Sequence, residues 1–221
     1  MNNKDLEKII TITSIFGIIA FITVPISVML YFMYGGVPPI WNVLLRTLFS
    51  MIGLVSVLIF FSGFQYVIKS FNKNYEWVAT LIYSNVCIYL TTNFVAHSLE
   101  AGSVLNPKGV AVDATQDGIL AQGNYLLYGS IGRILTATYM MAIGILTIRT
   151  RVFPLWSGWV AIIIAMINIA FIPSMFFGTN TGDFYSAVGW GNSAFAASLY
   201  AFYVLIMSII MLKNKRKYMG V

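Results

Sequence analysis

The sequence is short of charge, and this shortage determines its class. Only 9% of its 221 residues are charged and 59% are hydrophobic, whereas an ordinary soluble domain has about 25% charged residues. A soluble fold of this composition would have too few polar side chains to cover its surface, so lipid is the expected solvent. Helical spans of about 20 residues each leave only loops and tails. We therefore expect a single domain over residues 1–221.

Cysteine and histidine occur once each, as Cys87 and His97. A lone cysteine forms no intramolecular disulfide, and within an apolar run it is typical of a small buried hydrophobe. A single histidine excludes a metal site built on several imidazoles. The sequence also lacks a Gly-x-Ser-x-Gly elbow, a His-Glu-x-x-His motif and a phosphate-binding glycine loop with lysine. We expect no metal, no cofactor and no catalytic residue, so an enzyme is the least favoured class.

Six apolar runs have the length of membrane spans. Glycine, proline, asparagine and aspartate, which favour turns, fill the breaks between them. The first run resembles the core of a signal peptide, but it is too long for a cleaved segment. We predict an all-α, polytopic six-transmembrane-helix bundle with spans at about 9–33, 41–67, 77–97, 125–148, 153–177 and 187–212.

Basic residues predict the orientation of this bundle. With six crossings, the N-terminus and the C-terminus lie on the same side. If that side is cytoplasmic, the outer loops hold only Lys108, and the inner segments hold Lys4, Lys8, Lys69, Lys73, Arg149, Arg151, Lys213, Lys215, Arg216 and Lys217. Cytoplasmic loops carry such an excess, so the net charge of +6 needs no nucleic-acid partner. The lysine-rich inner face and the low cysteine content fit a bacterial plasma membrane.

Two arginines interrupt apolar runs near their outer ends. Arg46 lies five residues after Trp41, or about 8 Å below the outer edge of its span at 1.5 Å per residue. Arg133 lies in the outer part of the fourth span. Both side chains could snorkel to the headgroups. Alternatively, they face the bundle interior and bind an anion, because the guanidinium fork suits carboxylate and phosphate.

The third run carries a polar stripe. Asn85, Tyr89, Asn93 and His97 recur every four residues, and Glu100 extends the same face. Lipid penalises a polar face, so the stripe should point inward. Interhelical hydrogen bonds that only order the bundle are the simpler interpretation for Asn85. The other members near the outer surface, at a depth similar to that of the arginines, predict a hydrated pocket.

Small residues recur at a spacing of four in the sixth run, at Ser193, Ala197 and Ala201. Such ladders let helices approach closely. They predict packing inside the bundle or contact with a membrane-protein partner. The longest connection, residues 98–124, is expected to fold partly over the outer mouth, because long loops in compact domains are often functional.

Residues 149–159 read Arg-Thr-Arg-Val-Phe-Pro-Leu-Trp-Ser-Gly-Trp. This segment resembles the basic Pro-Leu/Arg-Trp turn of several families of uncharacterised small bacterial membrane proteins, a resemblance that implies no activity. The architecture also looks like the substrate-binding component of energy-coupling-factor vitamin transporters, which has six helices, both ends inside and an outward pocket. The Ala-x-x-x-Ala signature of that component's first helix is absent here.

Three functions remain open from the sequence. The first is a membrane protein that binds a small or lipidic, anionic ligand from the outer side, as a transporter component, through Arg46, Asn93, His97, Glu100 and Arg133. The second is an interaction protein, such as a subunit, immunity factor or regulator, that contacts another membrane protein through the ladder in the sixth run. The third is a membrane enzyme with His97 or Glu100 as acid or base.

Overall fold

The computed structural model describes residues 3–34, 37–71, 73–105, 121–180 and 182–215. Throughout these ranges the regular elements are helical, and six helices are long and apolar enough to cross a membrane. The predicted all-α fold and the number of candidate spans are therefore confirmed, and they indicate a multi-pass membrane protein. Most of the connection predicted to cover the outer mouth, residues 106–120, lies outside the described ranges.

Two candidate spans are single long α-helices, and the other four include a 3-10 or π turn. The elements are α1 (Asn3–Tyr31), α2 (Ile40–Phe71), the 3-10 turn η1 (Lys73–Tyr75), α3 (Glu76–Val104), the short α4 (Ala121–Leu126), the π-helical turn η2 (Leu127–Ile131), α5 (Gly132–Thr150), α6 (Leu155–Phe171), the 3-10 turn η3 (Ile172–Phe176), the π-helical turn η4 (Gly191–Ala196) and α7 (Ala197–Lys213). The fourth and sixth spans therefore begin with π turns at η2 and η4.

Several predicted bounds differ from the observed helices by a few residues. The third span was predicted to end at residue 97, but α3 continues to Val104 and carries Glu100. The ion pair of Glu100 with Arg46 allows a charged residue to lie on the helix at this point. The fifth span changes from α-helix to a 3-10 turn after Phe171, where Pro173 follows. Proline has no N–H for the α-helical hydrogen bond.

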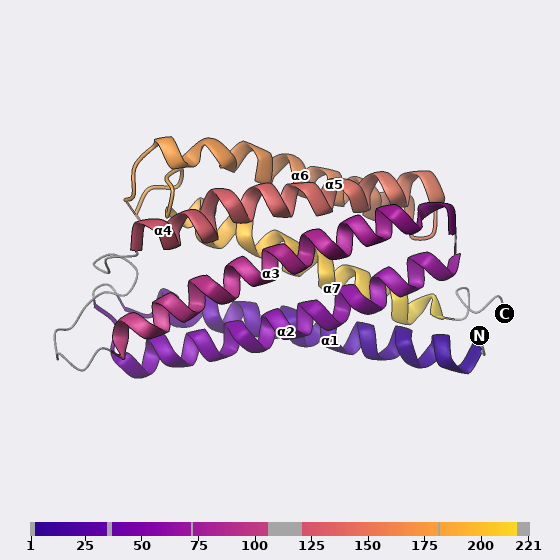
Figure 1. Ribbon diagram of the computed structural model, residues 1–221, viewed down its shortest axis with the longest axis horizontal. Helices are drawn as coiled ribbons and strands as arrows, with labels where there is room; N and C mark the ends of the chain where they lie inside the picture. Colours follow the sequence, from indigo (N-terminus) through magenta and orange to yellow (C-terminus); the bar gives the residue numbers. More distant parts are fainter. Residues whose placement is uncertain (1–2, 35–36, 72, 106–120, 181, 216–221) are drawn as a thin grey trace.

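The helices pack side by side as an elongated bundle (Figure 1). α1 packs against α2 and α7, α3 packs between α2 and α5, and α6 packs against α5. Both described chain ends lie at one end of the bundle (Figure 1), where Lys215 pairs with Glu7 at 2.8 Å. We call this the termini end, and we call the opposite end, where α1 ends and α2 begins, the cavity end.

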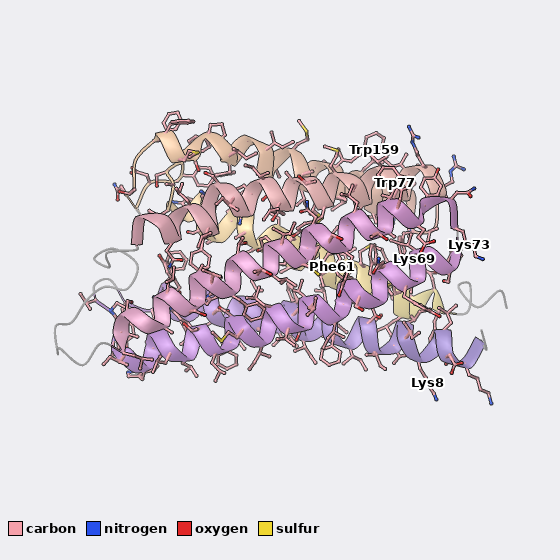
Figure 2. The ribbon with its side chains drawn as sticks, viewed as in Figure 1. Lys8, Phe61, Lys69, Lys73, Trp77 and Trp159 are labelled. Atoms are coloured by element: carbon pink, nitrogen blue, oxygen red, sulfur yellow. The ribbon has the colours of Figure 1, made fainter. Side chains whose placement is uncertain are left out.

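An aromatic core fills the half of the bundle near the termini end. Phe64 of α2 stacks on Phe153 with ring centroids 5.2 Å apart, and Phe61 meets Tyr139 of α5 edge-to-face at 5.6 Å. All four rings are buried, and Phe61 lies inside the bundle in Figure 2. Such pairs add about 0.5–1.5 kcal/mol beyond their burial. The interior of this half is therefore filled with side chains.

α5 and α6 are held together by a contact between two glycines. A Cβ atom on Gly144 would lie 2.9 Å from the carbonyl oxygen of Gly158, and one on Gly158 would lie 3.1 Å from that of Gly144. Small residues allow such close approach of helix backbones in membranes. Any side chain at either position would push the two helices apart.

The segment 149–159 forms the tight turn that joins these two helices. Arg151 ends α5 in the left-handed conformation, with φ of 52°, and Pro154 precedes α6. The hydroxyl of Ser157 donates to the carbonyl of Pro154 at 2.7 Å. Figure 2 shows Trp159 in the half of the bundle that contains this turn. Lys8, Lys69 and Lys73 lie toward the same end, the termini end.

Candidate functional site

A partly enclosed cavity of about 200 Å³ lies between the helices toward the cavity end. Its wall includes residues from α1, α2, α3, α5 and α7 and from both π-helical turns. All five residues predicted to bind a ligand contribute to this wall: Arg46, Asn93, His97, Glu100 and Arg133. The structure therefore brings together residues from three spans, and their role toward a ligand stays a prediction.

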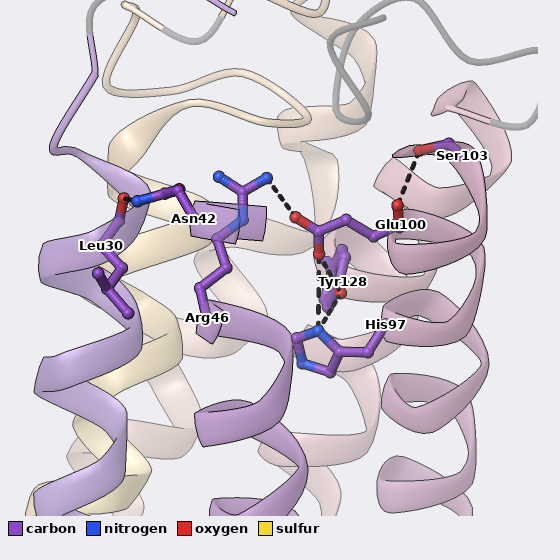
Figure 3. Close-up of polar contacts among 7 residues, drawn as sticks. All are labelled: Leu30, Asn42, Arg46, His97, Glu100, Ser103 and Tyr128. Carbon is purple, nitrogen blue, oxygen red and sulfur yellow. Dashed lines mark hydrogen bonds and ion pairs between the residues drawn. The ribbon is translucent and has the colours of Figure 1, made fainter. Parts of the chain in front are cut away.

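An ion pair between Arg46 of α2 and Glu100 of α3 forms one side of the cavity (Figure 3). The two side chains are only 6% and 5% exposed. The guanidinium carbon of Arg46 also lies 4.9 Å from the ring centre of Tyr31 at the end of α1, a cation–π distance. Arg46 therefore points into the bundle and is not free to reach headgroups.

Tyr128 connects the ion pair to His97 (Figure 3). Its hydroxyl donates to Oε2 of Glu100 at 3.2 Å and lies 2.7 Å from Nδ1 of His97. Because a hydroxyl has one proton and two lone pairs, both contacts are satisfied when His97 carries a proton on Nδ1 and donates it to Tyr128. His97, Glu100 and Tyr128 thus form one hydrogen-bonded cluster on the cavity wall.

Arg133 lies deeper in the bundle, and the partners that the structure describes for it are neutral. It donates from Nη1 to the amide oxygen of Asn168 on α6 at 3.0 Å and from Nη2 to the carbonyl of Tyr128 at 3.4 Å, and its Nε has no hydrogen-bond partner. The residue is 2% exposed. No carboxylate pairs with it in the part of the chain that the structure describes. Among the described residues, the positive charge of Arg133 on the cavity wall therefore has no carboxylate partner.

Asn93 and two tyrosines line the cavity between the two arginines. The Asn93 amide donates to the carbonyl of Tyr89 in its own helix at 2.8 Å. Tyr89 meets Tyr200 of α7 edge-to-face, with ring centroids 5.5 Å apart. Three members of the predicted polar stripe, Tyr89, Asn93 and His97, therefore do face inward, and they share the cavity wall.

The two π-helical turns approach each other beside the cavity. A Cβ atom on Gly129 in η2 would lie 2.9 Å from the carbonyl oxygen of Ala187 and 3.1 Å from the amide nitrogen of Asn192 in η4. That amide donates to Ser174 at 2.9 Å and to Ala187 at 3.0 Å. π turns occur frequently at functional sites. Here they place Tyr128 and Ser193 on the cavity wall.

Tyr128 and Asn168 are the site residues that the sequence did not reveal. Tyrosine is common in this chain, with 13 copies, so no single one attracts notice. Asn168 lies in an apolar run, and its amide also donates to the carbonyl of Ile164 at 2.9 Å. One indication was available in the sequence. A buried arginine needs hydrogen-bond acceptors, and the side-chain amide of Asn168 in α6 could supply one.

The small-residue ladder lies partly on the cavity wall. Ser193 and Ala197 line the cavity, and Ala201 is buried. These residues thus face other helices of the same chain, and their predicted contact with a partner protein stays a prediction. Over the described residues, no group of three histidine, cysteine, aspartate or glutamate side chains could hold a metal ion.

Comparisons of the chain with protein-family models, with curated proteins and with solved structures gave no match.

Proposed function

We propose that this protein spans the membrane with both termini in the cytoplasm and binds a small organic anion in the cavity, from the outer side. The charge distribution supports this orientation. Lys8, Lys69, Lys73 and Lys213 lie at the termini end, and cytoplasmic loops are rich in such residues. The cavity end would then face outward, as a binding component of a transporter requires.

The uncompensated charge of Arg133 is the observation that carries the proposal. A buried charge without a partner costs several kcal/mol, and a charged residue inside a membrane protein normally has a partner or lines a hydrated path. Arg46 and Glu100 neutralise each other, so the cavity wall keeps the positive charge of Arg133. An anion in the cavity would supply the missing partner.

The chemistry of the wall favours a carboxylate or phosphate group. Guanidinium binds the paired oxygens of such groups through two donors, and Nε of Arg133 has a proton to donate. Asn93 and Tyr200 offer further polar atoms beside it, whereas Val24 and Leu54 line the apolar part of the cavity. The ligand therefore carries an anionic group on an apolar body.

Native mass spectrometry of the protein, extracted gently from its own membranes, tests this function. We expect an added mass of a few hundred daltons that Arg133→Gln removes. Arg149→Gln is the matched control, because Arg149 is on the same helix but exposed at the termini end. An added mass that survives Arg133→Gln would refute the anion site, and a retained protein chain in its place would favour an interaction protein.

A further inference from the structure

α1 and α7 are in close contact near the termini end but separate toward the cavity end. At Gly17 of α1, an added Cβ atom would overlap the hydroxyl of Ser208 on α7. One turn further along, Phe21 meets Phe202 edge-to-face, with ring centroids 5.0 Å apart. Beyond this pair, residues of both helices line the cavity. We call the stretch of cavity wall between α1 and α7 beyond the two rings the gap.

Small and apolar side chains border this gap. α1 contributes Val24 and Val28, η4 contributes Ala194, and α7 contributes Ala197 and Ser198. The α7 residues are partly exposed, so they do not seal the space between the helices. Phe32, which also lines the cavity, is 54% exposed. The cavity therefore reaches the outer surface of the bundle along α1.

The charged groups of the cavity lie on the other side. Arg46, Glu100 and Arg133 belong to α2, α3 and α5, and neither α1 nor α7 contributes a charged residue to the wall. The site thus has a charged side, buried in the bundle, and an apolar side that opens where the bilayer would be. This polarity matches that of a lipid, whose charged headgroup and apolar chain lie at opposite ends.

The cavity is too small to hold a whole lipid. Its volume is about 200 Å³, below the range of about 300–1,000 Å³ for ordinary ligand pockets. A headgroup with a few methylene groups fills such a space, so the rest of a long chain must extend outside. The gap between α1 and α7 is the apolar exit that the structure offers.

We infer that the ligand is an anionic single-chain amphiphile that enters sideways from the bilayer, with its headgroup at Arg133 and its chain leaving between α1 and α7. This inference rests on the proposed anion site and adds the class of ligand and its route. It predicts that the gap matters for long-chain ligands and not for short ones, because a short chain stays within the cavity.

Binding of hexadecyl phosphate and of hexyl phosphate to the protein in phosphatidylcholine nanodiscs tests the lateral route between α1 and α7 separately from the anion site. Ala197→Trp places a large ring in the gap, and Ile209→Trp is the control, because Ile209 lies on α7 and is exposed away from the cavity. The ring would block the path of the long chain, so we expect hexadecyl phosphate binding to weaken at least about tenfold. Hexyl phosphate binding should stay unchanged in both variants.

The outcomes distinguish failure of the route from failure of the site. If Ala197→Trp leaves both ligands unaffected, or weakens both equally, the lateral route is wrong although the anion site stands. If Arg133→Gln leaves both ligands unaffected, the anion site itself is wrong.

A second measurement uses the unsubstituted protein and so does not depend on the folding of Ala197→Trp. Hexadecyl phosphate with a photoreactive group at its chain end should label α1 and α7 around Val28 and Ser198, in a fraction that Arg133→Gln abolishes. Labelling of Leu54 and Tyr89 in its place would mean that the chain folds up inside the bundle, and it would overturn the lateral route.

Discussion

Arg46 and Glu100 form an ion pair from which solvent is almost excluded, although they belong to different helices and only 6% and 5% of their side chains are exposed. The pair joins α2 to α3 at the cavity end. It also explains how a carboxylate can lie on a long helix within an apolar bundle, because each charge removes the cost of burying the other.

Loss of one partner of this pair should destabilise the protein strongly. Glu100→Gln leaves the Arg46 charge buried, and breaking such a pair costs about 3–5 kcal/mol. Replacing both partners, as Arg46→Met with Glu100→Leu, should restore much of this loss. The free energy of unfolding in mild detergent measures both effects.

The pair of Lys69 and Glu76 provides the control. Its atoms are 3.4 Å apart, and the side chains are 32% and 60% exposed. Exposed pairs contribute about 0–1 kcal/mol, so Glu76→Gln should change stability little. Equal losses for Glu76→Gln and Glu100→Gln would contradict the importance given to burial.

Tyr128→Phe should loosen the cluster on the cavity wall. It removes the hydroxyl that contacts both Glu100 and His97, and a lost hydrogen bond to a charged group costs about 1.5–3 kcal/mol. Thermal unfolding measures the loss. Tyr34→Phe is the control, since Tyr34 is 37% exposed, and a similar loss there would argue against the cluster.

Gly129→Ala should separate the two π turns. The added methyl group would lie 2.9 Å from the carbonyl oxygen of Ala187, and overpacking of this kind costs about 1–3 kcal/mol. Gly102→Ala, where nothing lies within 4 Å, should be neutral or slightly stabilising, because alanine favours helix by about 1 kcal/mol over glycine. A stability assay that ranks the two variants in the opposite order would refute the close approach.

Cysteine labelling tests the proposed orientation in a Cys87→Ser background. Thr179→Cys lies at the cavity end and Lys213→Cys at the termini end, both at exposed positions. A membrane-impermeant maleimide should label Thr179→Cys in intact cells and Lys213→Cys only after permeabilisation. The reverse pattern would place the cavity on the cytoplasmic side.

The sequence predicted the spans and drew attention to the charged residues of the candidate site. Lipid makes every charge inside a span expensive, so Arg46 and Arg133 stand out without any knowledge of the fold, whereas Glu100 was expected beyond the end of its span and was chosen because it extends the polar stripe. The four-residue spacing placed Asn93 and His97 on one face, and the structure directs that face to the cavity.

The remaining features of the fold and of the candidate site could not be predicted, because they depend on which part of the folded chain lies against each residue. The spacing of Ser193 and Ala197 predicts a small face, but it does not say whether another helix or an empty gap lies against that face. The end of α3 depended on Arg46, a residue far away in the sequence, whose ion pair with Glu100 allows the helix to continue. Tyr128 reaches its partners through a π turn, which leaves no clear pattern in the sequence.

That π turn makes the number of residues in η2 as important as their identity. In a regular α-helix, positions five apart point in directions about 140° apart, so Tyr128 and Arg133 would face different neighbours. At η2 the backbone kinks at Gly129, whose ψ of −109° is not helical, and Tyr128 and Arg133 both line the same cavity. A single-residue deletion here would change no chemical group of the site, yet it would rotate one half of the site away from the other. Natural variants of this chain should therefore keep the length of Leu127–Ile131 as strictly as the identity of Tyr128 and Gly129 within it.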